Sequence, residues 1–135
     1  MIRPMEASDI PSVHRLQEHL TYFDPGIVEA AVRGPFCGRV AVEDGSVAGY
    51  AIAFPGDPAT LSELVVEPGY RRQGYGRALV SNVTLAVESS VIAVLTSVEN
   101  EDAKRFYTAM GFGLDGRKHE FYADGTDALR LVLGE

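Results

Sequence analysis

The stretch from residue 60 to residue 98 constrains the fold more than any other part of the chain. It begins with the apolar run TLSELVVE, passes through the basic, glycine-containing segment RRQGYG at 71–76, and continues into a helix-like pattern over 77–90. A second apolar run, VIAVLTSV at 91–98, is typical of a strand buried on both faces. Two strands joined through a helix form a parallel crossover, which predicts an α/β or α+β domain.

The segments before residue 60 predict two helices and a hairpin. The first helix is expected to begin with Ser8 as its N-cap and to carry an apolar stripe that ends at Phe23. A short second helix is expected over 25–35. Two strand-like runs within 36–54 are joined by EDGS, whose Asp-Gly pair is a strong hairpin signal.

The segments after residue 98 predict one more helix and a second hairpin. The helix is expected over 100–112, with Asn100 as its N-cap and Gly111 as its C-terminal stop. The tail over 118–135 is expected to turn at the Asp-Gly pair 124–125. The predicted order is therefore β-α-α-β-β-β-α-β-α-β-β, which is a mixed sheet with helices around it.

The RRQGYG segment is suited to bind an anion. The first N–H groups of a helix lack intrahelical partners, glycines let an anion approach them closely, and arginines add charge-assisted hydrogen bonds. A dinucleotide fingerprint would need a third glycine where Leu79 stands, and a Walker loop would need G-K-[ST]. The pattern that fits is [QR]-x-x-G-x-[GA], through Arg71, Gly74 and Gly76. From these residues alone, the segment is either a pyrophosphate cradle or a plain structural turn.

Composition excludes several functional classes. The formal net charge is −7, which argues against nucleic-acid binding because that function needs a basic surface. No apolar run approaches the ~20 residues of a membrane helix, and the N-terminus has no secretory apolar region. A single cysteine rules out an internal disulfide and favours a cytoplasmic protein. The three histidines lack metal-ligand spacing, so no metal is expected.

Three stretches match one family pattern in the same order along the chain. They are IRPMEASDIPSVHRL, LVVEPGYRRQGYGRALV and VENEDAKRFYTAMGF, and they resemble the GNAT family of N-acetyltransferases. The tail FYADGTDALRLVL is also similar to the ending of the ribosomal-protein N-terminal-alanine acetyltransferases, with Phe121 in place of one tyrosine. The resemblance implies one acetyltransferase domain over 1–135, with a mixed sheet of about six to seven strands and about four helices.

The resemblance also implies roles for particular residues. The glycine-containing loop would hold the pyrophosphate of acetyl-CoA, and the backbone of the fourth strand would pair with the pantetheine arm, which Asn100 would also bind. Tyr107 would act as the general acid that protonates the leaving thiolate. Two of these residues have plainer explanations, because Asn is a preferred N-cap and Tyr107 continues an apolar helix stripe. The residues expected to bind the cofactor are Leu64, Val65, Val66, Arg71, Arg72, Gln73, Gly74, Tyr75, Gly76, Arg77 and Asn100.

The general base is the point at which the chain departs from its family. Ribosomal members carry a glutamate five residues before the asparagine, and this chain has Leu95 there. Glu63 is the nearest substitute, acting through water, although a solvated carboxylate at a strand end explains it equally well. A third alternative needs no strong base, since an α-amino group with a pKa of about 8 is roughly one-tenth neutral at pH 7. A lysine amine would be about a hundredfold less available.

The expected activity is acetyl transfer from acetyl-CoA to a primary amine by direct attack in a ternary complex. The acceptor is either a protein N-terminal α-amine or a small amine such as an antibiotic, a polyamine or an amino acid. Tyr122 is expected to line the acceptor pocket, or else to be an ordinary hairpin aromatic. A protein of a different class, a non-catalytic acyl-CoA sensor, is the competing hypothesis. No nucleic-acid or membrane partner is expected, and a homodimer is expected only because dimers are common in the family.

Overall fold

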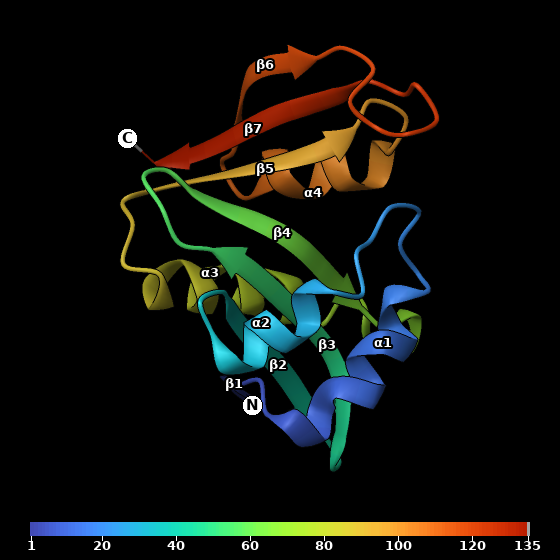
Figure 1. Ribbon diagram of the computed structural model, residues 1–135, viewed down its shortest axis with the longest axis vertical. Helices are drawn as coiled ribbons and strands as arrows, with labels where there is room; N and C mark the ends of the chain where they lie inside the picture. Colours follow the sequence, from blue (N-terminus) through green and yellow to red (C-terminus); the bar gives the residue numbers. More distant parts are fainter. Residues whose placement is uncertain (135) are drawn as a thin grey trace.

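The computed structural model describes residues 1–134 (Figure 1). Seven strands and four α-helices follow one another along the chain, with two short 3-10 turns at 7–9 and 68–70. The elements are β1 (Ile2–Pro4), α1 (Ile10–Gln17), α2 (Ile27–Arg33), β2 (Cys37–Glu43), β3 (Ser46–Phe54), β4 (Ala59–Val66), α3 (Tyr75–Ala86), β5 (Val91–Ser97), α4 (Glu101–Ala109), β6 (Gly113–Lys118) and β7 (Ala128–Gly134). This order confirms the predicted succession of elements.

All seven strands belong to one mixed sheet with the order β1-β2-β3-β4-β5-β7-β6. Strands β4 and β5 are parallel, and every other neighbouring pair is antiparallel. The connection between β4 and β5 runs through α3, which confirms the predicted parallel crossover. The fold class, a mixed sheet flanked by four helices, is confirmed as well.

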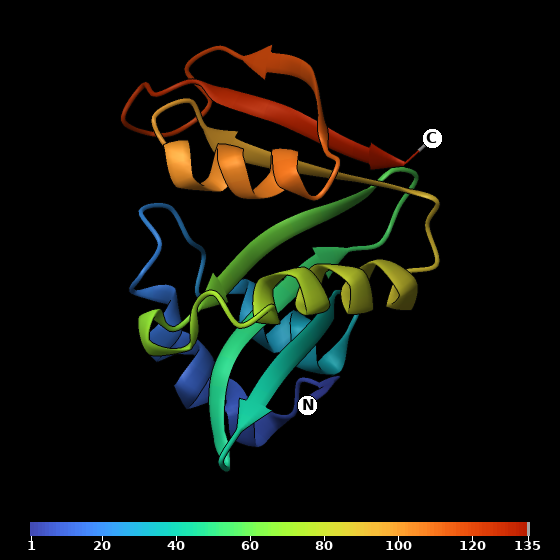
Figure 2. The same cartoon turned by 180° about the vertical axis from the view of Figure 1, so that it is seen from behind.

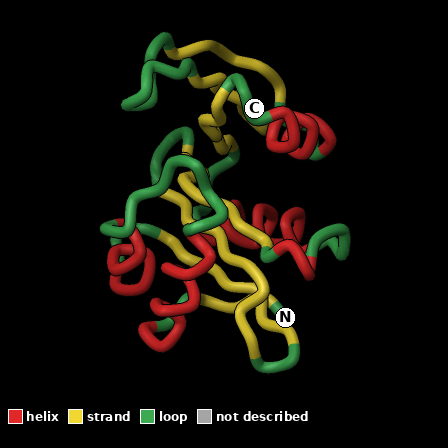
Figure 3. Tube along the Cα trace, turned by 90° about the vertical axis from the view of Figure 1, so that its right-hand side faces the viewer, coloured by secondary structure: helices red, strands yellow, loops and turns green. Residues whose placement is uncertain are grey.

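Helices cover both faces of the sheet, so the chain has two apolar cores (Figure 3). Helix α3 contributes Leu79, Val80 and Val83 to one core, which also contains aromatic residues of α4 and of the turn after it. Helices α1 and α2 contribute to the second core on the opposite face, with Val13, Leu16 and Val28 among its residues. Figure 2 shows α3 and α4 side by side on one face, with their N-terminal ends at the same side of the molecule.

Strands β4 and β5 separate along their length, which opens the sheet. Their pairing is limited to Ala59–Leu61 against Ile92–Val94. The register of β4 against β3 shifts immediately afterwards, because Ile52 faces Glu63 while Ala53 faces Leu61. Such a bulge bends the strand, and Figure 1 shows the two strands diverging toward their C-terminal ends. The divergence leaves the edge of β4 that faces β5 without a strand partner beyond Leu61, among the described residues.

Two of the predicted elements were misplaced. The first helix does not have Ser8 as its N-cap, because Ser8 lies inside the 3-10 turn, and it ends at Gln17 rather than continuing to Phe23. The N-cap position of α1 is occupied by Asp9 instead. Asp9 accepts two hydrogen bonds from Arg3, of 2.8 and 3.0 Å, and they hold the pKa of its carboxyl below the usual range. The first strand of the tail hairpin is Gly113–Lys118, so residues 119–127 form a long loop where a strand and a tight turn were expected.

Within residues 1–134, no helix has the length and apolar character needed to cross a membrane.

Candidate active site

A cleft lies where β4 and β5 diverge, and it consists of two connected hollows. The first, called here the loop hollow, has a volume of about 720 Å³ and is lined by the glycine-containing segment, the end of β4 and α4. The second, the aromatic hollow, has a volume of about 660 Å³ and is lined by the segment after α1, the β4 and β5 strands and the β6–β7 loop. Both hollows share the same central residues, which are His19, Leu20, Leu64, Asn100, Ala103 and Tyr107.

The loop hollow contains the predicted anion cradle. Gly74 precedes the first residue of α3 and has a φ of 87°, a left-handed conformation that favours glycine. The N-terminal N–H groups of α3 carry the positive end of the helix dipole toward this hollow. Arg71, Arg72 and Arg77 line the hollow, and none of them pairs with a carboxylate among residues 1–134. These groups together form a positively charged surface open to a ligand.

Internal contacts fix the shape of this cradle. The Arg71 Nε donates to the carbonyl oxygen of Val66 at 3.0 Å, which ties the loop to the end of β4. A Cβ at Gly76 would lie 3.1 Å from the Phe106 ring, so close packing against α4 explains this glycine. The Tyr75 hydroxyl donates to Glu43, and that hydrogen bond raises the pKa of Tyr75 to about 12.

Most of the residues expected to bind the cofactor do line the loop hollow. The exception is Gln73, which lies in the same segment but is exposed outside the lining. Leu64, Val65 and Val66 form the β4 wall of the hollow, where the strand has left its partner β5. Backbone N–H and C=O groups on such an edge need another partner, which a ligand or water can provide.

Tyr107 lies at the junction of the two hollows. Its side chain is only 7% exposed and packs edge-to-face against Phe106 and Phe112, so it belongs to the predicted apolar stripe of α4. Burial raises the pKa of its phenol well above the usual range. Within residues 1–134, no buried side-chain oxygen lacks a hydrogen-bond partner. The Tyr107 hydroxyl has no partner among these residues, so it is not fully buried and faces the cleft. It is therefore a protonated phenol with an available O–H at the centre of the site.

Asn100 has the capping role expected of it. Its Oδ1 accepts a hydrogen bond of 3.1 Å from the backbone N–H of Ala103 and so caps α4. The residue also borders both hollows, and its side-chain amide makes no hydrogen bond as a donor within residues 1–134. The cap and the contact with a ligand use different atoms of the same side chain, so the two roles are compatible.

Glu63 is not a solvated carboxylate at a strand end, and that expectation was wrong. It lies in the middle of β4, is 6% exposed and borders the aromatic hollow. Its Oε1 accepts hydrogen bonds from Gln17 Nε2 at 3.0 Å and from the Tyr50 hydroxyl at 2.8 Å. Its Oε2 accepts from the backbone N–H of Asp24 at 3.1 Å. The bulge in β4 turns this side chain toward α1 and the segment that follows it.

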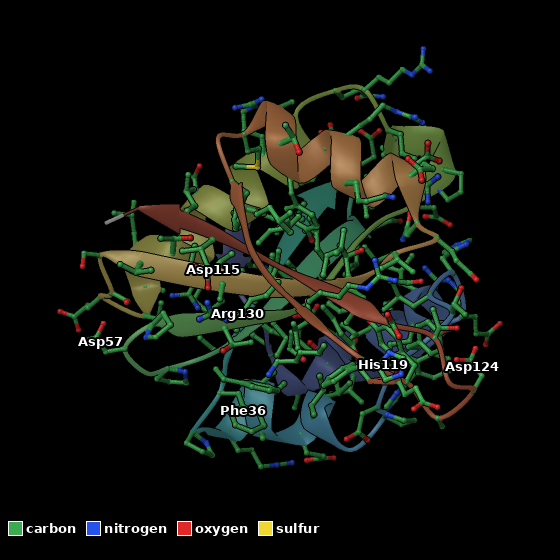
Figure 4. All side chains as sticks on the ribbon, turned by 90° about the horizontal axis from the view of Figure 1, so that it is seen from above. Phe36, Asp57, Asp115, His119, Asp124 and Arg130 are labelled. Carbon is green, nitrogen blue, oxygen red and sulfur yellow. The ribbon has the colours of Figure 1, made fainter. Side chains whose placement is uncertain are left out.

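Two segments far apart in the sequence meet over the mouth of the aromatic hollow. Tyr22, in the segment after α1, stacks on Tyr122 of the β6–β7 loop with ring centroids 3.8 Å apart and an angle of 11° between planes. The Tyr22 hydroxyl also donates to Asp124 at 2.7 Å, across 102 residues of sequence. Figure 4 shows Asp124 and His119 at the end of the molecule opposite Asp57. Tyr122 therefore lines this hollow. The contacts made by Tyr22, Tyr50 and Gln17 join distant segments, so they leave no local signal in the sequence.

Among the described residues, no group of three or more His, Cys, Asp or Glu side chains is gathered closely enough to hold a metal ion.

Residues 5–112 match the acetyltransferase (GNAT) family. The chain belongs to this family. It is 28% identical over 141 residues to ribosomal protein bS18-alanine N-acetyltransferase of Escherichia coli (strain K12), across 98% of this chain and 95% of that protein. Ard1 from Thermoplasma volcanium superposes with a TM-score of 0.88 at 25% identity, over 99% of this chain and 96% of that one.

A shorter match links the chain to a eukaryotic relative. N-alpha-acetyltransferase 30 of Xenopus laevis is 34% identical over 76 residues, which are 54% of this chain and 28% of that protein. The match therefore spans less than a third of this relative's length. Both of these relatives are named as N-acetyltransferases, one of alanine in ribosomal protein bS18 and the other an N-alpha-acetyltransferase.

Proposed function

We propose that the protein transfers the acetyl group of acetyl-CoA to the N-terminal α-amine of a polypeptide. The observation that carries the proposal is the arrangement of two hollows that meet at the Tyr107 hydroxyl, one with a basic, glycine-containing wall and the other without. In this arrangement, acetyl-CoA and the amine substrate would approach the Tyr107 phenol from opposite sides. Direct transfer between them needs no acyl-enzyme intermediate.

The loop hollow is assigned to acetyl-CoA. Its pyrophosphate would lie on the N-terminus of α3, near Gly74 and the three arginines without carboxylate partners. The pantetheine arm would extend along the open edge of β4 toward Tyr107, where Leu64–Val66 offer backbone groups. A backbone N–H from this edge can also polarise the thioester carbonyl, an interaction worth ~3 kcal/mol per donor in other enzymes.

The chemical step then uses the Tyr107 proton. The neutral amine nitrogen attacks the thioester carbonyl carbon, and the carbon–sulfur bond breaks as the new amide forms. The sulfur leaves with the bonding electron pair and takes the proton of the Tyr107 hydroxyl, while the surplus amine proton passes to water. Burial raises the pKa of the Tyr107 phenol well above its usual range, so the hydroxyl keeps its proton at neutral pH and can donate it as the thiolate forms.

An α-amine suits this site better than a lysine amine does. No carboxylate occupies the position of Leu95, which lines the aromatic hollow with an apolar side chain. An acceptor that is partly neutral at pH 7 has the least need of a base, and α-amines meet that condition. The names of two relatives support the same acceptor, because one is an N-alpha-acetyltransferase and the other is a ribosomal protein bS18-alanine N-acetyltransferase.

The proposal is tested with acetyl-CoA and a library of peptides that differ in their first residue. Mass spectrometry should find the acetyl group on the α-amine of a subset of these peptides. Matched peptides with a blocked N-terminus and a free lysine should remain unmodified, and so should polyamines and aminoglycosides. Turnover of small amines alone would favour the small-molecule alternative. Acetyl-CoA binding without any turnover would favour the sensor.

A further inference from the structure

The buried carboxylate of Glu63 connects β4 to the segment between α1 and α2. Gln17 Nε2 donates both to Glu63 and to the carbonyl oxygen of Asp24, at 3.0 and 3.2 Å. The Asp24 backbone N–H donates to Glu63 in turn. Glu63 and Gln17 thus hold both polar groups of the Asp24 backbone. Because Glu63 and Gln17 are buried, this anchor is shielded from competing water.

The Glu63 carboxylate accepts hydrogen bonds from three groups of the protein, which are Gln17 Nε2, the Asp24 backbone N–H and the Tyr50 hydroxyl. Burial, followed by the charge of Glu63, raises the pKa of the Tyr50 phenol well above its usual range, so Tyr50 donates as a neutral group. The Gln17 Oε1 lies 3.0 Å from His14 Nδ1, which turns the amide nitrogen of Gln17 toward Glu63. A carboxylate has about four lone-pair directions, and three of them are occupied here. Glu63 is therefore built as an acceptor of protein hydrogen bonds.

The anchored segment carries Tyr22, one member of the aromatic pair that borders the aromatic hollow. Tyr22 lies two residues before Asp24, and it contacts the β6–β7 loop both by stacking on Tyr122 and by its hydrogen bond to Asp124. Displacement of Asp24 would therefore change the position of Tyr22 and, through it, of Tyr122. Figure 1 shows this segment rising from α1 toward the β6–β7 end of the sheet.

We propose that Glu63 is a positioning residue for the acceptor, with Gln17 as its link to the segment that carries Tyr22, and that Glu63 is not the general base. The inference rests on the proposed function, because it assigns the aromatic hollow to the acceptor. The affinity for the acceptor then depends on a buried hydrogen-bond network. Gln17, which belongs to this network, is fully buried and does not line the hollow, so the acceptor does not contact it. The affinity for acetyl-CoA depends on the opposite hollow and is independent of this network.

The test compares three variants in steady-state kinetics with a peptide acceptor. Gln17→Met removes the link and leaves the Glu63 carboxylate in place, and Glu63→Gln removes the charge. Glu18→Gln is the control, since it removes a neighbouring exposed carboxylate of the same helix region. Both Gln17→Met and Glu63→Gln should raise the acceptor KM about tenfold, which corresponds to the loss of one or two hydrogen bonds. The kcat should stay within about threefold, and the control should match the wild type.

Two further readouts separate positioning from catalysis and from misfolding. The acid limb of the kcat–pH profile should persist in Glu63→Gln, because another group or the amine itself controls it. The Kd for acetyl-CoA should be unchanged, which also shows that the variants are folded. Amide hydrogen exchange at Asp24 should become at least about tenfold faster in both variants, since this N–H loses its acceptor or the support of that acceptor.

Opposite results would overturn the inference. A fall in kcat of about a hundredfold or more in Glu63→Gln, with loss of the acid limb and an unchanged acceptor KM, would make Glu63 the base. Unchanged exchange at Asp24 in both variants would show that the segment is not anchored there. If the wild type acetylated no peptide, the proposed function would fail, yet the exchange measurement would still decide whether the anchor exists.

Discussion

The two hollows of the cleft differ in how their polar groups are used. In the loop hollow, three arginines have no carboxylate partner among the described residues, and one of them, Arg71, donates a hydrogen bond to the Val66 carbonyl oxygen. The first N–H groups of α3 lie at the same space, which a ligand would fill. In the aromatic hollow, Glu63 and Tyr22 are hydrogen-bonded to other parts of the protein. The first hollow leaves its arginines without carboxylate partners, whereas the second uses its buried carboxylate to fix its own shape.

This difference indicates how specificity is divided between the hollows. Under the proposed function, the arginines and glycines of one contiguous segment would bind a constant ligand, the pyrophosphate, and would tolerate variation elsewhere in the fold. The aromatic hollow, which is assembled from the segment after α1, β4, β5 and the β6–β7 loop, depends on long-range contacts. Changes in any of those elements can therefore alter the specificity for the amine substrate without affecting the affinity for acetyl-CoA. If the two hollows are independent sites, a substitution in one of them should leave the affinity for the other hollow's ligand unchanged.

The largest effect is expected at the junction, where the hollows meet. Tyr107→Phe removes the O–H and keeps the ring contacts with Phe106 and Phe112. Loss of the general acid should lower kcat about a hundredfold or more, while the Kd for acetyl-CoA and the thermal stability stay close to those of the wild type. Rapid-quench and steady-state kinetics measure kcat, and calorimetry measures the Kd and the thermal stability. A kcat within about threefold of the wild type would exclude Tyr107 as the acid.

A pair of glycines tests the independence of the hollows directly. Gly74 and Gly125 both have a φ of 87°, and a Cβ at either position meets no atom within 4 Å. Alanine at either position should therefore impose a similar backbone strain, about 1–2 kcal/mol. Gly74→Ala should weaken acetyl-CoA binding by about tenfold, and Gly125→Ala should instead raise the acceptor KM. If each variant affected both ligands equally, the two hollows would not be independent sites.

A smaller effect is expected from the aromatic pair. Tyr22→Leu removes the stacked ring and the hydrogen bond to Asp124, and Tyr22→Phe removes the hydrogen bond alone. An aromatic pair contributes about 0.5–1.5 kcal/mol beyond its buried area, so Tyr22→Leu should raise the acceptor KM two- to tenfold. Tyr22→Phe should have a lesser effect. A change in acetyl-CoA affinity in either variant would contradict the division between the hollows.

The same division explains which features the sequence could predict. The parallel crossover, the cap at Asn100 and the loop before α3 are local patterns, since each depends on residues close together in the chain. The network around Glu63 joins residues 17, 24, 50 and 63, and its geometry depends on the β4 bulge, which leaves no local signal. Strand β6 was misplaced because GLDGRK has two glycines and no apolar alternation, so its pairing with β7 determines its structure.

The smallest expected effect concerns the anchor of the β6–β7 loop. Asp127 accepts hydrogen bonds from the Glu120 backbone N–H at 2.8 Å and from Arg117 Nε at 2.7 Å, which lower its pKa to about 2. Since this pKa is lower than in the unfolded chain, the stabilisation is complete above about pH 4 and is lost as the pH falls through about 2. The loop should therefore keep this anchor throughout the range in which the enzyme is assayed.

The Glu120 amide reports this titration in NMR spectra, because its N–H donates directly to the Asp127 carboxylate. Its chemical shift should change with a midpoint near pH 2, and the change should vanish in Asp127→Asn. A midpoint near 4, the ordinary value for an aspartate, would mean that the loop is not held by this carboxylate. The β6–β7 loop would then depend mainly on Tyr22, and the aromatic hollow would have one anchor, at Glu63, instead of two.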